Sequence, residues 1–108
     1  MELHVFKGKV VSQPVVVPIQ GYAVALIVID IDSATIKGRK KFFCQAPKYL
    51  TSNGNGLATT MLSDVVCSSI GDDVRIEVEA NLESGYMDTQ IRYFANDTLG
   101  IGNIYEKL

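Results

Sequence analysis

The chain has no tryptophan, one histidine (His4), and two cysteines (Cys44 and Cys67) that are far apart in the sequence. Zinc sites need ligands at short, recurring spacings, and these three scattered residues do not supply them. Nothing in the sequence places His4 beside either cysteine, so a Cys–His nucleophile pair is not indicated. Both cysteines have apolar neighbours, in FFCQ and VVCSS, so we expect free thiols buried in the core. The sequence therefore predicts no metal site and no cofactor.

Long hydrophobic runs and phosphate-loop motifs are also absent. The longest apolar run, residues 22–29, is far shorter than the ~18–20 residues of a membrane span. The N-terminus, MELHVFKGK, lacks the apolar segment of a signal peptide, so we expect a cytoplasmic protein. Neither GxxxxGK[ST] nor GxGxxG occurs, which argues against nucleotide binding through a glycine-rich loop.

Carboxylates recur at two-residue spacing, which places them on one face of a strand. They form two groups, Asp30 with Asp32, and Glu77 with Glu79 and Glu83. Paired carboxylates serve two-metal and glycosidase sites. However, no histidine accompanies these, and alternating glutamates are typical of a solvated strand face. We therefore expect no catalytic residue and no enzyme.

The net charge of −2 is unevenly distributed. Residues 1–50 hold seven lysines and arginines against three acids, a net charge of +4, and residues 51–108 hold three against nine, a net charge of −6. This asymmetry points to a basic face built from the first half of the chain.

Hydrophobic periodicity predicts five strands and one short helix. Apolar and polar residues alternate from Val74 to Leu82, a turn follows at Ser84 and Gly85, and a second run covers residues 86–95. Upstream runs lie at residues 3–17, interrupted at Pro14, and at residues 22–31 and 40–45. Helical spacing lies between the third and fourth strands and ends at Gly71, with one apolar stripe: Met61, Leu62, Val65, Val66 and Ile70. This order predicts a single all-β domain over residues 1–108, a five-stranded OB-fold barrel with one short helix.

The second strand is apolar on both faces, because Val24, Leu26 and Val28 alternate with alanines and isoleucines. A small barrel covers only the inner face, so the outer face needs another element or subunit. We therefore expect a homodimer or a higher homo-oligomer. In contrast, the segment PVVVP at residues 14–18 has to be an edge strand or a loop, because proline cannot donate to a central ladder.

Cations and aromatic residues interleave in the segment KGRKKFF at residues 37–43. Single-stranded nucleic acid is bound by cations along the backbone and by flat rings that stack on bases. Alternation puts Lys40 with Phe42 on one face and Lys41 with Phe43 on the other, so one phenylalanine should face solvent. The alternative is a solvated hairpin tip with two core phenylalanines.

A second aromatic set lies on the last strand, where alternation assigns Met87, Ile91 and Tyr93 to the core and exposes Arg92 with Phe94. Such an exposed pair suits base stacking or a dimer contact equally. The candidate contact residues are seven cations and five aromatics: Lys7, Lys9, Lys37, Arg39, Lys40, Lys41, Arg92, Phe42, Phe43, Tyr49, Tyr86 and Phe94.

With these motifs the chain resembles the bacterial and phage single-stranded DNA-binding proteins over residues 5–95. The likeness rests on the segments GKVV (8–11), VALIV (24–28), KFFC (41–44) and GDDVRIEVEANL (71–82). It implies an OB-fold protein that coats single-stranded DNA, with RNA left open, in replication, phage DNA packaging or recombination. The family's tryptophan platforms and acidic tail are missing here. A short, tailless chain looks more like the dimeric strand-coating proteins of small phages, which would act in the host cytoplasm. The alternative is an OB-like protein–protein interaction module that does not bind nucleic acid.

Overall fold

The computed structural model describes residues 1–47 and 56–104 and is mostly β-structure, with one short helix in that part of the chain. In chain order the elements are β1 (Glu2–Val10), β2 (Val15–Ile19), β3 (Tyr22–Asp32), β4 (Lys37–Pro47), α1 (Gly56–Val66), β5 (Asp73–Asn81), β6 (Tyr86–Met87), β7 (Tyr93–Asn96) and β8 (Ile101–Gly102).

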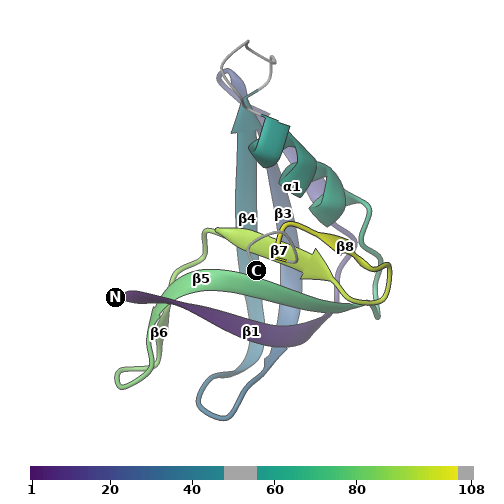
Figure 1. The fold of residues 1–108 in the computed structure, drawn as a ribbon. Helices are drawn as coiled ribbons and strands as arrows, with labels where there is room; N and C mark the ends of the chain where they lie inside the picture. The colour runs from purple at the N-terminus through teal and green to yellow at the C-terminus, as the bar shows by residue number, and fades with distance from the viewer. Residues whose placement is uncertain (48–55, 105–108) are drawn as a thin grey trace.

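The strands form one strongly curled antiparallel sheet, a half-barrel (Figure 1). Its path runs β2-β3-β1-β5-β7-β8; β4 pairs with β3, and β6 pairs with the end of β5. The long β3–β4 hairpin stands upright in Figure 1, and β1, β5 and β7 cross in front of it. The helix lies by the upper end of this hairpin. The helix in the described part of the chain has 11 residues, and no helix there has the length and apolar run that a bilayer crossing requires.

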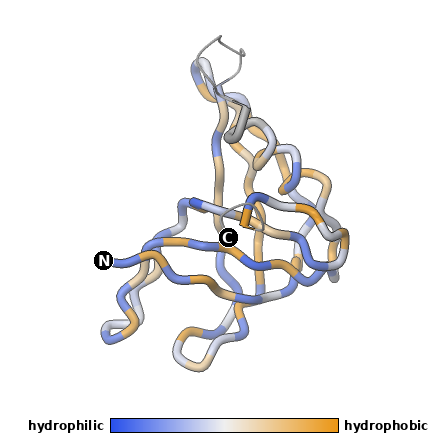
Figure 2. The backbone as a smooth tube through the Cα atoms, viewed as in Figure 1, coloured by the Kyte–Doolittle hydropathy of each residue, from blue (hydrophilic) through white to orange (hydrophobic). Residues whose placement is uncertain are grey.

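Strand alternation fills the inside of the half-barrel with apolar side chains. Hydrophobic and hydrophilic residues alternate along β1 and β5 (Figure 2), and Val74, Ile76 and Val78 of β5 are almost fully buried. The inner face of β3 contributes Ile27 and Ile29, which are also almost fully buried. Burying each of these side chains contributes about 1.5–3 kcal/mol, so the curled sheet is stabilised mainly by its inner face.

Gly8 is where β1 bends against β3. It pairs with Ile31, and a Cβ at this position would lie 2.4 Å from the carbonyl oxygen of Asp30 and 2.6 Å from Cγ2 of Ile29. Only glycine permits so close an approach. The chain at Gly8 is thus a close crossing of two strands.

The first predicted strand is two segments, β1 and β2, and β2 is an edge strand as its prolines require, since it pairs only with β3 in the described residues. A turn at Gln20 and Gly21 joins β2 to β3, and Gly21 has a φ of 80°. The third strand begins three residues earlier than predicted, at Lys37, so the basic segment lies in β4 and does not form a hairpin tip. The C-terminal segment, for which the sequence predicts no element, adds β8 beside β7.

The last predicted strand, residues 86–95, is broken, and this reverses one side-chain assignment. After β5 the chain turns and runs back beside it, and we call residues 87–93 the returning chain. From the pair Ala80–Met87 to the pair Glu77–Tyr93 there are three residues along β5 but six along the returning chain. An excess of three, an odd number, exchanges the two faces. Phe94 is therefore fully buried, and the prediction that it is exposed beside Arg92 is wrong.

The predicted extent of the helix and the predicted burial of Cys67 are also wrong. The helix ends at Val66, so Ile70 lies outside it and is 63% exposed, whereas Met61 and Val65 are buried as predicted. Cys67, expected in the core, is exposed, and only Cys44 is a buried thiol. Both cysteines are free.

Candidate nucleic-acid interface

The solvent side of β4 carries most of the cations of the KGRKKFF segment. Lys37, Arg39 and Lys41 are exposed and alternate with residues that point to the inner side of the sheet. Phe43 follows on the same side and is half-buried, whereas Phe42 on the inner side is 1% exposed. The prediction that one phenylalanine faces out beside a lysine is confirmed, and that residue is Phe43. The fourth cation, Lys40, lies opposite Ile29 on the inner side and is only partly exposed.

The solvent sides of β2, β3 and β4 form one continuous surface, which we call the β3–β4 face. Opposite residues of an antiparallel pair share a face. Near the 33–36 turn the face is charged, since Asp32 lies opposite Lys37 and Asp30 opposite Arg39. Towards the 20–21 turn it becomes mostly apolar, although Gln45 lies there opposite Val24. The apolar residues come from three strands: Val28, Leu26, Val24, Tyr22, Val15, Val17, Ile19, Phe43 and Pro47.

Phe43 is held from both sides at the boundary between the two ends. Its side chain shares the face with Leu26, its partner on β3. On the other side its N–H donates to the Thr89 carbonyl (2.9 Å) and its carbonyl accepts from the Ile91 N–H (2.8 Å). This parallel bridge, centred on Gln90, joins β4 to the chain that follows β6, two residues before the exposed Arg92. The ring therefore sits on a fixed backbone, two residues after Lys41 on the same side of β4.

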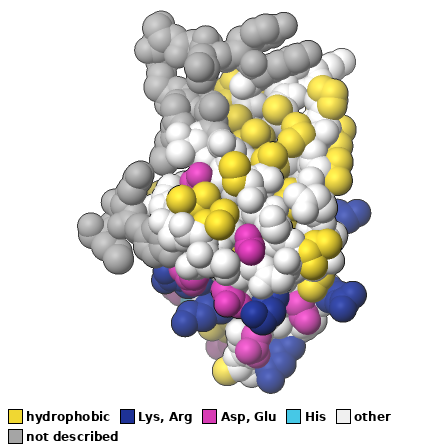
Figure 3. All heavy atoms as spheres, turned by 90° about the vertical axis from the view of Figure 1, so that its right-hand side faces the viewer, with side chains coloured by type: hydrophobic (Ala, Val, Ile, Leu, Met, Phe, Trp, Pro, Cys, Tyr) yellow, Lys and Arg dark blue, Asp and Glu magenta, His cyan; other side chains and the backbone are white. Residues whose placement is uncertain are grey.

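Beside the charged end, the bend of β1 encloses a hollow of about 680 Å³. Three of the predicted cations line it: Lys7, Lys9 and Lys37. Four aspartates line it as well: Asp30, Asp32, Asp73 and Asp97. Figure 3 shows the same mixture at the lower end of the molecule, where basic and acidic side chains interleave below an apolar region. The hollow thus combines positive and negative groups.

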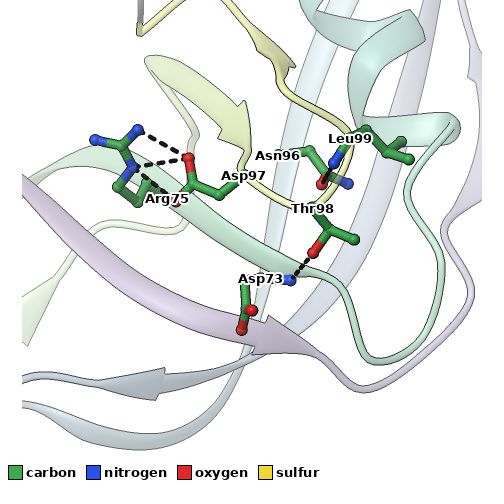
Figure 4. A network of polar contacts seen from close by, with 6 residues as sticks. All are labelled: Asp73, Arg75, Asn96, Asp97, Thr98 and Leu99. Carbon is green, nitrogen blue, oxygen red and sulfur yellow. Dashed lines mark hydrogen bonds and ion pairs between the residues drawn. The ribbon is translucent and has the colours of Figure 1, made fainter.

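Two of these aspartates are engaged by neighbouring cations, and Figure 4 shows one of the two pairs, Arg75 with Asp97. Arg75 grips Asp97 with two nitrogens, Nη2 at 2.8 Å from Oδ1 and Nε at 2.9 Å from Oδ2. Lys9 Nζ lies 2.7 Å from Oδ1 of Asp73, and the backbone N–H of Asp73 donates to Thr98 Oγ1. Bidentate arginine–carboxylate pairs fix geometry as well as charge. The wall of the hollow that contains Asp73 and Asp97 is therefore held in place by these ion pairs and hydrogen bonds.

A buried asparagine next to Asp97 forms hydrogen bonds that link β7 to residues 68 and 72. Asn96 is fully buried, and its Nδ2 donates to Ser68 Oγ (3.0 Å) and Asp72 Oδ2 (2.9 Å), while its Oδ1 accepts from the Leu99 N–H. The hydrogen bond from Asn96, with one from the Ser69 backbone, lowers the pKa of Asp72. The sequence analysis missed this network, because residues 72, 75 and 97 carry no spacing that signals a contact.

The other predicted contact residues are dispersed. Tyr86 lies on β6 opposite Asn81 and is 50% exposed. Phe42 and Phe94 are core residues and offer no surface for stacking. Tyr49 lies outside the described residues. Glu77, predicted on a solvated face, is buried at 6% exposure.

Comparisons with protein-family models, with curated proteins and with solved structures return no match for this chain. Within residues 1–47 and 56–104, no three histidine, cysteine or carboxylate side chains are grouped so as to hold a metal ion.

Proposed function

We propose that the protein binds single-stranded DNA, without strong sequence preference, across the β3–β4 face. The observation that carries the proposal is the placement of Phe43 beside Lys41 and Arg39 on one exposed strand, with Arg92 across the bridge. An aromatic platform among cations supplies stacking and phosphate contacts together. As expected from the sequence, RNA is left open.

The strand pairing supports an OB-fold as the scaffold. When β1 with β2, and β6 with β7, are each counted as one interrupted strand, the described elements follow the order strand, strand, strand, helix, strand, strand, with the two-residue β8 added at the end. The first strand pairs with the second and the fourth, and the third meets the last through the parallel bridge at Phe43. In OB-folds the surface of the second and third strands binds oligonucleotides, and here that surface is the β3–β4 face.

The charges of this face are available for a ligand. Among the described residues, no carboxylate lies within 4 Å of the cationic groups of Lys37, Arg39 or Lys41. Binding releases counterions condensed on the nucleic acid, and a cation already held in a tight ion pair neutralises a phosphate less completely. Unengaged ones contribute to the salt dependence of binding in full.

The test is fluorescence anisotropy with a labelled oligo-dT at two salt concentrations. Binding should weaken as salt rises, with a slope of about 0.7 per phosphate contact for a single strand. Duplex DNA of the same length should bind more weakly, because its bases are not free to stack. Absence of binding at low salt would rule out the proposed function.

The apolar end of the β3–β4 face favours a second candidate, a contact with another protein surface. Val15, Ile19 and Tyr22 are 56%, 53% and 46% exposed. Pro14 and Pro18 have no N–H to offer along the edge of β2, so we propose a contact through the face instead of strand-to-strand pairing. A second copy of this chain would match the surface with itself about a two-fold axis. This is the homodimer expected from the sequence. A module that binds only protein would share this surface and ignore DNA.

A further inference from the structure

An alternating row of charges crosses four strands beside the hollow, and three of its four members line the hollow. Opposite residues in the ladders share a face, so the register places one side chain from each strand in line. From β5 to β4 the row reads Asp73, Lys9, Asp30 and Arg39. Asp32 and Lys37 form a further opposite pair beside it. Because the row has as many acidic as basic side chains, it does not suit a site that binds phosphate alone.

Around the hollow the charges are divided into engaged and unengaged groups. Lys9 is bonded to Asp73, and Arg75 holds Asp97. In contrast, among the described residues no cationic group lies within 4 Å of the carboxylates of Asp30 and Asp32, and no hydrogen bond involves either carboxylate. Both aspartates are exposed, they are two residues apart on β3, and both line the hollow.

A ligand that fits such a site carries an anion and, a few ångströms away, a hydrogen-bond donor. A nucleotide has both, because its phosphate is anionic and three of the four bases carry an exocyclic amino group. Carboxylates accept hydrogen bonds from the N4 amino group of cytosine, whereas uracil and thymine present a carbonyl oxygen at that position. A volume of about 680 Å³ is within the range of small-ligand sites, which is roughly 300–1,000 Å³.

We propose that the hollow receives one nucleotide of the bound strand, with the phosphate on Lys7 and Lys37 and an amino-bearing base on Asp30 and Asp32. The inference rests on the proposed function and deepens it. Stacking and phosphate contacts alone would give binding that does not depend on sequence. The hollow adds a preference for cytosine over uracil or thymine. The carboxylates select the base, and the lysines hold its backbone.

The experiment compares labelled oligo-dC with oligo-dU of equal length at neutral pH, because the two bases differ only in the groups at C4 and N3. The native chain should bind oligo-dC about fivefold more tightly or better, the lower bound for one base-specific contact. In Asp30→Asn/Asp32→Asn the ratio should fall towards one, since asparagine offers a donor and an acceptor to either base. The matched control Glu2→Gln/Glu83→Gln removes the same charge from exposed sites outside the hollow and should keep the ratio.

Each other outcome has a separate meaning. A ratio near one in the native chain, or a preference that survives Asp30→Asn/Asp32→Asn, overturns the base-reading site and leaves DNA binding intact. Equal tightening of both oligonucleotides in that variant also overturns it, because the aspartates would then only repel phosphate. No binding of either oligonucleotide means that the proposed function itself has failed. Circular dichroism of each variant verifies that it is folded.

Discussion

The two ends of the β3–β4 face are built from the same pair of strands but present opposite surfaces. Beside the 33–36 turn, Asp32 and Asp30 face Lys37 and Arg39; beside the 20–21 turn, apolar residues continue onto β2. The inner sides of both ends are alike, since Ile29 near one turn and Ala25 near the other are fully buried. One uninterrupted hairpin therefore maintains a single core while its outer side presents two chemically different surfaces.

The largest expected effect comes from placing a charge at the apolar end. Ile19→Asp should abolish the proposed homodimer, because a two-fold contact loses the side chain twice and gains two buried carboxylates. The loss of about 1.5–3 kcal/mol for each fully buried side chain raises the dissociation constant at least tenfold. Light scattering after size exclusion measures the mass. The side chain is 53% exposed, so folding should survive. A native chain that is monomeric at micromolar concentration would contradict the dimer.

Phe43 lies where the two ends meet, and its removal gives the next largest effect. Phe43→Ala should weaken oligo-dT binding by about 1–3 kcal/mol, the contribution of one base–aromatic stack. Tyr86→Ala is the matched control, because this ring is exposed on β6, a strand that pairs with β5. Anisotropy titrations measure both. Equal losses in the two variants would show that the boundary of the face is not the binding surface. Thermal unfolding of each variant reveals any loss of stability.

A smaller effect separates the cations of β4 by the side on which they lie. Arg39→Ala and Lys41→Ala should each reduce the salt slope by about 0.7, the value for one phosphate contact on a single strand. Lys40→Ala removes the same charge from the inner side and should change the slope less. Three equal slopes would mean that overall charge, and not the β3–β4 face, governs binding.

The smallest perturbation, thiol labelling, tests whether the two sides of β4 are assigned correctly. Burial raises the pKa of the Cys44 thiol to about 12, so at neutral pH it is protonated as well as inaccessible. Cys67 is exposed. A thiol reagent should therefore label one cysteine in the native protein and two after denaturation, which a mass spectrum of the digest resolves. Rapid labelling of Cys44 in the native state would reverse the sides of β4 and with them the whole face.

Alternation in the sequence predicted which residues of β3 and β5 share a face, because both strands are paired along their length, but for β4 it left open which of Phe42 and Phe43 faces out. It placed the isoleucines of β3 and Val74 of β5 on core faces, and these residues are buried. It also found the cations and the aromatic ring of β4. What it identified in advance was thus the composition of the candidate interface and the strands that carry it.

Tertiary contacts account for what the sequence did not predict. The returning chain leaves β5 to meet Phe43, and that detour is set by β4, far away in the sequence. The alternation of residue types in the sequence does not reveal this break in pairing, so the prediction that Phe94 is exposed was wrong. The hollow went unpredicted for a related reason: its wall joins β5 to the turn after β7 through Arg75 and Asp97.

The bridge at Phe43 has a consequence for how the protein opens and closes. Long ladders join β3 to β4 and β1 to β5, but in the described residues two backbone hydrogen bonds at Phe43 attach β4 to the returning chain. Partial unfolding proceeds where the fewest interactions are lost. We therefore expect the first local opening to break the two hydrogen bonds at Phe43, while the β3–β4 and β1–β5 ladders stay intact. The amide protons of Phe43 and Ile91 should then exchange with solvent well before those in the middle of β3.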